Sequence, residues 1–231
     1  MKLLALDTST EACSAALLMA DQICERFVVA PRGHSDLILD MLEALLAEAG
    51  VSLGAIDALA FGQGPGSFTG VRIGASVAQG IAFARDLPVV PVSSLAALAQ
   101  FCKEKKILAA IDARMGEIYW GVYEREAEGL VRLMDSEQVC IPEAVPLVAG
   151  KGWFGAGTGW GVYKDKLCAR LGRRVDGWEV EHYPRASATA RLAAAAFVRG
   201  ESVMAEQALP VYLRDNVVKK PSRAKINNKS P

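Results

Sequence analysis

A glycine-rich run in the first third of the chain constrains the fold more than any other segment. It reads Gly62-Gln63-Gly64-Pro65-Gly66-Ser67-Phe68-Thr69-Gly70-Val71-Arg72-Ile73-Gly74. An apolar segment, Ile56 to Phe61, precedes it, and small and apolar residues from Val71 to Arg85 follow it. This pattern predicts a strand, a tight turn and a helix start, the arrangement that directs backbone N–H groups at an anion.

The run nevertheless lacks the parts of familiar phosphate-binding motifs. It contains no Gly-Lys-Ser/Thr triplet, and no Gly-x-Gly-x-x-Gly pattern with a following acidic ribose ligand. Glycine also permits positive φ and close backbone approach, and Pro65 fixes one φ angle. Two interpretations therefore stay open: a degenerate phosphate loop, or a segment that serves tight packing alone.

Two aspartates stand at equivalent places in two similar units. Leu3 to Leu6 is an apolar strand pattern that ends at Asp7, and Ile107 to Ile111 is another that ends at Asp112. In both units a short turn and two further strand patterns follow, so a β-meander occurs twice. We interpret this as an internal duplication. It predicts an α/β fold of two similar lobes around a cleft, each with one aspartate at a strand end.

The turns after these strands could form vestigial nucleotide or phosphate loops, with the aspartates holding a hydrated metal. The alternative, which we favour, is that each aspartate accepts hydrogen bonds from the backbone of its own turn. The second turn carries an arginine and lacks paired glycines. The candidate loop residues are Asp7, Thr8, Ser9, Thr10, Gly64, Gly66, Ser67, Asp112 and Arg114.

The catalytic residue types are sparse. The only histidines are His34, predicted at a helix start, and His182, predicted in a polar surface loop. No His-x-x-x-His or Cys/His cluster exists, so no metal site is expected, and no Gly-x-Ser-x-Gly elbow accompanies a histidine. Five scattered cysteines without a Cys-x-x-Cys pair indicate reduced thiols and a cytoplasmic location.

Two predicted helices, residues 35–49 and 70–85, offer a partner surface. In the first, with Ser35 as the expected N-cap, apolar residues cover two adjacent stripes, of which one faces the sheet. In the second, small residues let another helix approach closely. The alternative is that both helices are buried within one lobe. The predicted interface residues are Leu37, Ile38, Met41, Leu42, Leu45, Val71, Gly74, Ala75, Ala78 and Ala82.

The expected organisation is an N-terminal lobe (1–102), a C-terminal lobe (103–213) and a basic tail (214–231). Overall the chain has 26 basic and 26 acidic residues, so its net charge gives no indication of nucleic-acid binding. The tail reads as disordered, with a tRNA-contacting arm as the alternative. No signal peptide and no membrane span are expected. The tail combines Asp215 with six cations, Arg214, Lys219, Lys220, Arg223, Lys225 and Lys229.

Four segments together resemble the bacterial TsaB family, also called YeaZ, from residue 1 to about Asn216. The glycine run and the second-turn segment are the specific ones, and their order and spacing match. The segments are Leu6-Asp7-Thr8-Ser9-Thr10, His34-Ser35, Gly64 to Gly74, and Asp112-Ala113-Arg114-Met115-Gly116-Glu117-Ile118-Tyr119.

The resemblance implies the two-lobed fold of actin, sugar kinases and Hsp70-type ATPases (the ASKHA fold). It implies work on N6-threonylcarbamoyladenosine at position 37 of tRNAs that read ANN codons. The related transferase TsaD carries a His-x-x-x-His metal site and uses threonylcarbamoyl-AMP made by TsaC. This chain has no such histidine pair. The resemblance therefore implies a pseudo-enzyme that pairs with TsaD through the two N-terminal helices.

Further partners follow from the same resemblance. The chain would help to recruit the ATPase TsaE, would self-associate as a homodimer when alone, and would meet tRNA indirectly through the complex. It would hold no cofactor of its own, and ATP or ADP would bind only at an interface shared with partners. Two enzymatic alternatives remain: a small ATP-dependent kinase of the actin-like fold, which would need Asp7 and Asp112, and a peptidase, which would need a nucleophile or metal.

Overall fold

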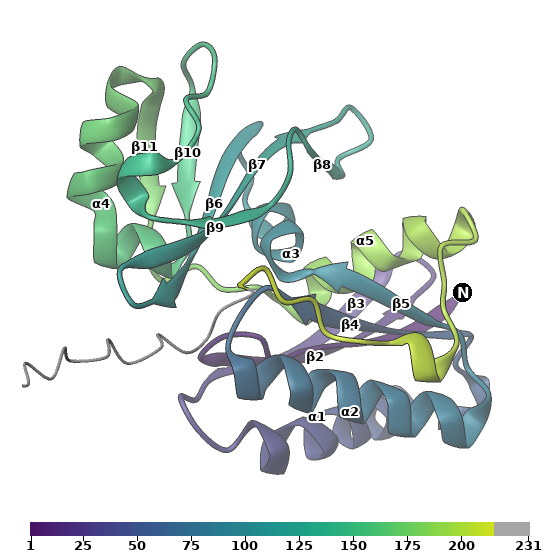
Figure 1. Cartoon of the computed structure of the whole chain (residues 1–231). Coiled ribbons are helices and arrows are strands. Elements are labelled where there is room, and N and C mark those ends of the chain that lie inside the picture. Colours follow the sequence, from purple (N-terminus) through teal and green to yellow (C-terminus); the bar gives the residue numbers. More distant parts are fainter. Residues whose placement is uncertain (215–231) are drawn as a thin grey trace, which may run out of the picture.

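Two mixed β-sheets with helices around them make up the computed structural model, which describes residues 1–214 (Figure 1). In the first sheet the strand order is β3-β2-β1-β4-β5. Its strands are β1 (Lys2–Asp7), β2 (Ala12–Met19), β3 (Gln22–Val29), β4 (Ala58–Gly64) and β5 (Val89–Ser93).

The second sheet has the order β11-β10-β6-β7-β8, and a short strand β9 pairs with β7. Its strands are β6 (Lys106–Arg114), β7 (Glu117–Arg125), β8 (Val131–Leu133), β9 (Gln138–Cys140), β10 (Trp153–Ala156) and β11 (Val175–Glu179). The helices are α1 (His34–Glu48), α2 (Phe68–Arg85), α3 (Ser94–Phe101), α4 (Thr158–Leu171) and α5 (Ala186–Val198). Short 3-10 turns are η1 (Leu53–Ala55), η2 (Pro142–Ala144), η3 (Gly172–Arg174) and η4 (Ala205–Gln207).

The two sheets share one topology. In each, an antiparallel meander (β1-β2-β3 or β6-β7-β8) is extended by two parallel strands, β4 and β5 in one and β10 and β11 in the other. Asp7 ends β1 and Asp112 lies near the end of β6, the matching strand. The predicted duplication and the two-lobed α/β actin-like (ASKHA) fold are therefore confirmed.

The central strand β1 is buried on both faces, which explains its continuous apolar sequence. Because side chains alternate along a strand, Leu4 and Leu6 pack with α1 and α2, whereas Leu3 and Ala5 pack against α5. Figure 1 shows these helices on opposite faces of the first sheet.

The lobe boundaries differ from the predicted ranges. Helix α5 lies on the first sheet, although residues 103–213 were expected to form the second lobe. Farther along, Val203 bridges Val89 of β5, and η4 packs against α2. Helix α3 in turn packs against β6 and β7 of the second lobe. The physical reason is that the open face of the first sheet needs an apolar cover, which the alanine-rich face of α5 supplies.

The helix starts are partly as expected. Ser93 caps α3 and accepts hydrogen bonds from the N–H groups of Leu95 and Ala96. Helix α1 instead begins at His34 after Gly33, whose φ of 89° falls in the left-handed region, so Ser35 is not its N-cap. In the described part of the chain, no helix combines the length and hydrophobicity needed to cross a membrane.

Candidate functional site

The glycine run is pressed against the turn between β1 and β2. A Cβ atom added to Gly66 would lie 2.2 Å from the carbonyl oxygen of Ser9, and one added to Gly70 would lie 2.0 Å from that of Thr8. The backbone N–H of Ser67 also donates to the carbonyl of Ser9 at 2.7 Å. Of the two interpretations, these contacts favour close packing, because the glycines let the run lie directly against the backbone of the first turn.

The hydroxyl groups of the first turn are used internally. Thr8 Oγ1 donates to the carbonyl of Gly70 at 2.8 Å, and Ser9 Oγ donates to Asp7 Oδ1 at 2.7 Å. Thr10 Oγ1 accepts a weaker hydrogen bond, 3.3 Å, from the N–H of Ala12. All three side chains are buried. The turn residues that were candidates for a phosphate loop therefore stabilise the turn itself.

Asp7 is buried beneath the glycine run rather than exposed to the cleft. Its Oδ1 accepts from the N–H and the hydroxyl of Ser9, and its Oδ2 has no hydrogen-bond partner among the described residues. Burial raises the pKa of this carboxyl, while the two bonds from Ser9 and the nearby His34 act in the opposite direction. This enclosure favours the interpretation that Asp7 serves its own turn.

This burial predicts how stability depends on pH. Because the folded-state pKa of Asp7 lies above its unfolded value, the folded chain binds the proton more tightly, and this contribution to stability falls as pH rises. We expect the unfolding free energy of Asp7→Asn, relative to wild type, to increase with pH by up to about 1.4 kcal/mol per unit above the ordinary aspartate range. Urea unfolding at several pH values measures it. A flat or decreasing difference would contradict this assignment.

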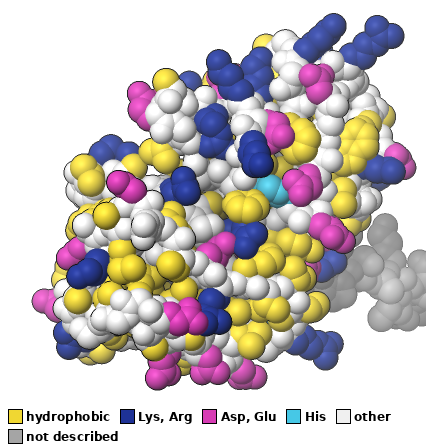
Figure 2. All heavy atoms as spheres, turned by 180° about the vertical axis from the view of Figure 1, so that it is seen from behind, with side chains coloured by type: hydrophobic (Ala, Val, Ile, Leu, Met, Phe, Trp, Pro, Cys, Tyr) yellow, Lys and Arg dark blue, Asp and Glu magenta, His cyan; other side chains and the backbone are white. Residues whose placement is uncertain are grey.

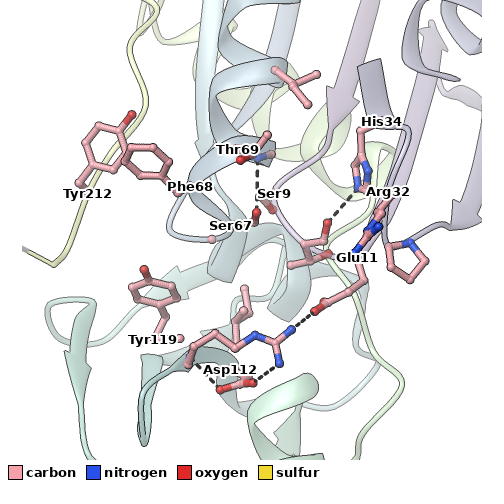
Figure 3. A pocket seen from close by; sticks show the side chains of 18 of the residues that line it. Ser9, Glu11, Arg32, His34, Ser67, Phe68, Thr69, Asp112, Tyr119 and Tyr212 are labelled. Atoms are coloured by element: carbon pink, nitrogen blue, oxygen red, sulfur yellow. Dashed lines mark hydrogen bonds and ion pairs between the residues drawn. The ribbon is translucent and has the colours of Figure 1, made fainter. Parts of the chain in front are cut away.

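The second turn is closed by ion pairs. The N–H of Arg114 donates to Asp112 Oδ1 at 2.9 Å, and its guanidinium lies 3.0 Å from Asp112 Oδ2. The same guanidinium reaches Glu11 of the first lobe at 2.7 Å. The two turns that would flank a nucleotide are thus joined directly to each other across the cleft (Figure 3). The interpretation that Asp112 serves its own turn is supported.

Beside this ion pair lies a cleft of about 670 Å³. Its walls come from both lobes: the β1–β2 turn, the loop before α1, the start of α2, the β6–β7 turn and residues 211–214. Figure 3 shows Phe68, Tyr212 and Tyr119 on one side and Arg32, His34 and Glu11 on the other. Within residues 1–214 no group of three His, Cys, Asp or Glu side chains is arranged to hold a metal.

The two histidines differ in how well their positions were predicted. His34 stands at the start of α1, as expected, and its Nε2 lies 2.9 Å from the carbonyl of Thr10. His182 was predicted to be a surface residue, but it is 5% exposed. Its Nδ1 lies 3.0 Å from Glu179 Oε2 and its Nε2 lies 3.3 Å from Cys102 Sγ. No local signal could have revealed this contact, because Cys102 is 80 residues away in the sequence.

The Cys102–His182–Glu179 arrangement has the connectivity of a nucleophilic triad, but its surroundings disfavour a thiolate. Burial, with Glu104 and Glu179 nearby, raises the pKa of Cys102 to about 12. Cys102 also follows the C-terminal end of α3, where the helix dipole disfavours negative charge. The cluster holds two segments together where the chain crosses between lobes.

We therefore expect Cys102 to react with iodoacetamide in the folded protein at least about 100-fold more slowly than the exposed Cys24, since the thiolate is the reacting species. Peptide mass spectrometry over a time course measures both rates. Comparable rates, with the Cys102 rate lowered by His182→Gln, would instead identify an activated thiol and revive the peptidase alternative.

The predicted partner interface needs correction. Leu45 and Ala78 lie in the core of the first lobe, 2% and 0% exposed, because the sheet takes up the face of each helix that was assigned to a partner. Of the predicted set only Leu37 and Met41 are partly exposed. Gly74 packs against Thr8 Oγ1 and Leu6. The core residues in this set are Ile38, Leu42, Leu45, Val71, Ala75, Ala78 and Ala82.

A different apolar surface remains on the same two helices. Phe83 is 84% exposed and Leu39 is 53% exposed. Ile73, Val77 and Ile81 recur at every fourth residue of α2 and are only partly buried, so they share one face of the helix. A Cβ on Gly80 would meet nothing within 4 Å. Helices α1 and α2 lie side by side beneath the first sheet (Figure 1).

Comparison with known proteins decides the family. The profile of the family described as TsaD, tRNA N6-adenosine threonylcarbamoyltransferase, matches residues 28–222. The chain is 43% identical over 225 residues to the tRNA threonylcarbamoyladenosine biosynthesis protein TsaB of Escherichia coli (strain K12), covering 94% of this chain and 96% of that protein. The chain belongs to the TsaB family. The TsaB protein of Haemophilus influenzae is similar to it at 42% identity over 229 residues, covering 94% and 95% of the two chains.

A solved structure supports the same family. The crystal structure described as an uncharacterized protein with similarity to peptidase YeaZ from Pseudomonas aeruginosa superposes with a TM-score of 0.86 at 50% identity, covering 92% of this chain and 99% of that one. This TsaB family member has a role in the biosynthesis of threonylcarbamoyladenosine in tRNA, and its fold is related to that of TsaD. The interpretation from the four motifs is therefore confirmed.

Proposed function

We propose that this TsaB family member is a non-catalytic partner subunit that TsaD needs to form N6-threonylcarbamoyladenosine at position 37 of tRNAs that read ANN codons. In this account TsaD supplies the metal and the transfer chemistry, and this chain supplies a surface that supports TsaD. Two findings support this proposal. The TsaB relatives are named for threonylcarbamoyladenosine biosynthesis, and the profile of the TsaD family matches most of this chain.

The observation that carries the proposal is that residues lining the cleft, or lying directly beneath it, bond to one another. The glycine run packs on the first turn, the hydroxyls of that turn bond internally, and Arg114 joins Glu11 across the gap. Catalysis of phosphoryl transfer would require free donors and a metal between these loops. In the described residues the hydroxyls of the first turn and the guanidinium of Arg114 are engaged within the fold itself, which supports a role without chemistry of its own.

The apolar surface of α1 and α2 is the surface we assign to TsaD. Leu39 on α1 and Ile73, Val77, Ile81 and Phe83 on α2 present apolar side chains, and Gly80 leaves room for a partner helix to approach. Exposed and partly exposed apolar side chains on two neighbouring helices are typical of a protein interface. The same surface would serve a homodimer when TsaD is absent.

Nucleotide and the further partners would act together with the pair formed by this chain and TsaD. Because the hydroxyls of the first turn and the guanidinium of Arg114 are already engaged within the fold, we expect ATP or ADP to bind only where TsaD or TsaE completes a site. TsaE would join the pair as a third subunit, TsaC would contribute through its product, and the complex would operate in the cytoplasm. None of these contacts requires a cofactor held by this chain.

Activity assays on the purified chain test whether it catalyses a reaction by itself. We expect no ATP hydrolysis and no threonylcarbamoyl transfer above a buffer blank when the chain is assayed alone with threonylcarbamoyl-AMP and tRNA. ATP turnover that copurifies with the chain and disappears in Asp7→Asn would instead establish the kinase alternative. Proteolysis that survives repurification and disappears in Cys102→Ala would establish the peptidase alternative.

A further inference from the structure

The last described segment of the chain, residues 203–214, runs along the first lobe before it reaches the second, and we call it the strap. Val203 exchanges two backbone hydrogen bonds with Val89 of β5, at 2.9 and 2.8 Å. Ala208 is fully buried in the core of the first lobe, and its carbonyl accepts a hydrogen bond from Gln79 Nε2 of α2 at 3.2 Å. The first part of the strap is therefore fixed to the first lobe.

The end of the strap passes the glycine run and is fastened to the second lobe. The N–H of Val211 donates to the carbonyl of Gln63 at 2.8 Å. Three residues later, the guanidinium of Arg214 donates to the carbonyl of Ala113 at 3.0 Å and forms an ion pair with Glu117. Ala113 and Glu117 flank the β6–β7 turn of the second lobe. Within a few residues the strap is thus bonded to both lobes.

Tyr212 lies between these two anchors and packs on the start of α2. Its ring centre is 6.1 Å from that of Phe68 and 4.9 Å from the guanidinium of Arg72, which itself lies 3.2 Å from the Phe68 ring centre. Aromatic and cation–π contacts of this kind strengthen the attachment of the strap to the first lobe. Val211, Tyr212 and Arg214 also line the cleft, so the strap forms part of its wall.

The two places where the chain crosses between the lobes lie apart from the end of the strap. One crossing joins α3 to β6 and the other joins β11 to α5, and they meet where Cys102 Sγ lies 3.3 Å from His182 Nε2. Within residues 1–214, neither of these two side chains lines the cleft, whereas Arg214 does. A rotation of the lobes about this junction would move the β6–β7 turn relative to the strap and break the contacts of Arg214.

The ion pair of Arg214 is the better protected of two that link the lobes at the cleft. Its side chain is 16% exposed and that of Glu117 is 34% exposed, so separating them would leave a largely buried charge without its partner. The side chains of Arg114 and Glu11 are 71% and 36% exposed, and solvent screens their attraction more strongly. On the rear face each lobe carries both acidic and basic side chains (Figure 2), so we attribute the hold to individual contacts rather than to opposite charges of whole lobes.

We propose that the strap fixes the angle between the two lobes, with Arg214 as the contact that fastens it to the second lobe. In two-lobed proteins that close around a ligand, the ligand supplies the contacts that hold the closed form together. Here the chain itself supplies such contacts, so the lobes need no ligand to keep their angle. This role is independent of how the chain pairs with TsaD.

Pulsed electron–electron resonance measures the relative position of the lobes as a distance between two spin labels. Asp21→Cys on the β2–β3 turn and Glu128→Cys on the β7–β8 turn place one label on an exposed residue of each lobe. The full chain should give one narrow distance distribution, and Arg214→Gln should widen it. The more accessible native cysteines are replaced by Ser in all samples: Cys24, Cys140 and Cys168.

Arg199→Gln is the matched control for the loss of a guanidinium. Arg199 pairs with Glu201 within the first lobe, at 2.7 Å, and both side chains are exposed. This variant should leave the distance distribution unchanged. Glu117→Gln should reproduce the effect of Arg214→Gln, and the double variant should add little, because both changes remove the same contact.

Hydrogen exchange followed by mass spectrometry gives a second measurement without labels or cysteine replacements. In Arg214→Gln, peptides that cover the β6–β7 turn and the N–H of Val211 should exchange at least about tenfold faster, the factor expected when a hydrogen bond from a charged group is lost. Peptides from α1 and β1 should keep their rates, because the first lobe stays folded.

Four results would overturn the proposal. The first is a broad distance distribution in the chain with an intact strap, and the second is an unchanged distribution and unchanged exchange in Arg214→Gln. The third is an equal effect of Arg199→Gln, which would indicate a general loss of stability. The fourth is a narrowing of the distribution by ATP or ADP, because a ligand rather than the strap would then set the angle. All samples are measured without TsaD, so failure of the proposed subunit role would leave this test intact.

Discussion

Gly80→Arg is expected to leave the protein folded and to abolish its pairing with TsaD, whereas Ala78→Arg is expected to unfold it. The two positions are two residues apart on α2 but lie on different faces. Gly80 opens onto empty space, and Arg is a better helix former than Gly. Ala78 is fully buried in the core of the first lobe. A guanidinium placed there without a partner should cost more than about 4 kcal/mol.

Circular dichroism melting and size-exclusion chromatography with TsaD distinguish these outcomes. Gly80→Arg should melt within a few degrees of wild type, on the order of the shift that 1 kcal/mol produces, and should elute apart from TsaD. An exposed Arg elsewhere on the first lobe, for example Asp21→Arg on the β2–β3 turn, controls for the added charge. Co-elution of Gly80→Arg with TsaD at wild-type levels would show that TsaD binds another surface.

Gly70→Ala is expected to destabilise the first lobe by several kcal/mol, even though alanine is the better helix former. The added Cβ would lie 2.0 Å from the carbonyl oxygen of Thr8, and that oxygen belongs to backbone that cannot rotate away. Overpacking of this kind costs about 1–3 kcal/mol or more where the neighbour is rigid. The hydrogen bond from Thr8 Oγ1 to the carbonyl of Gly70 would be lost with the displacement.

Gly80→Ala provides the matched control in the same helix. With nothing within 4 Å of its added Cβ, it should stabilise the fold by about 0.5–1 kcal/mol. Chemical denaturation of both variants gives the comparison directly. If Gly70→Ala were as stable as wild type, the glycine run would be a free loop, with backbone N–H groups open to a phosphate, rather than a packing contact.

What the sequence could predict was set mainly by local periodicity. Short apolar runs predict the strands that end at Asp7 and Asp112. The repeated pattern of these strands in turn predicts the duplication and the two-lobed fold. The packing of the glycine run was one of two stated interpretations, and only the position of Ser9 and Thr8 against Gly66 and Gly70 decides between them.

The errors came from contacts that local patterns do not encode. An apolar stripe on a helix shows that something covers it, but not whether the cover is the lobe's own sheet or a partner, so Leu45 and Ala78 were assigned to a partner. Helix α5 packs on the first sheet and His182 contacts Cys102, and both contacts join segments that are far apart in the sequence. The predicted basic tail is residues 214–231, and from residue 215 onward it lies outside the described part of the chain.

Reconstitution of tRNA modification tests the central proposal most directly. Purified TsaC, TsaD and TsaE are supplied with threonine, bicarbonate, ATP and unmodified tRNA, and N6-threonylcarbamoyladenosine is quantified by mass spectrometry with and without this chain. The account predicts product only when the chain is present, with wild-type yield from Asp7→Asn and Cys102→Ala and none from Gly80→Arg. Equal product without the chain would contradict the proposed subunit role.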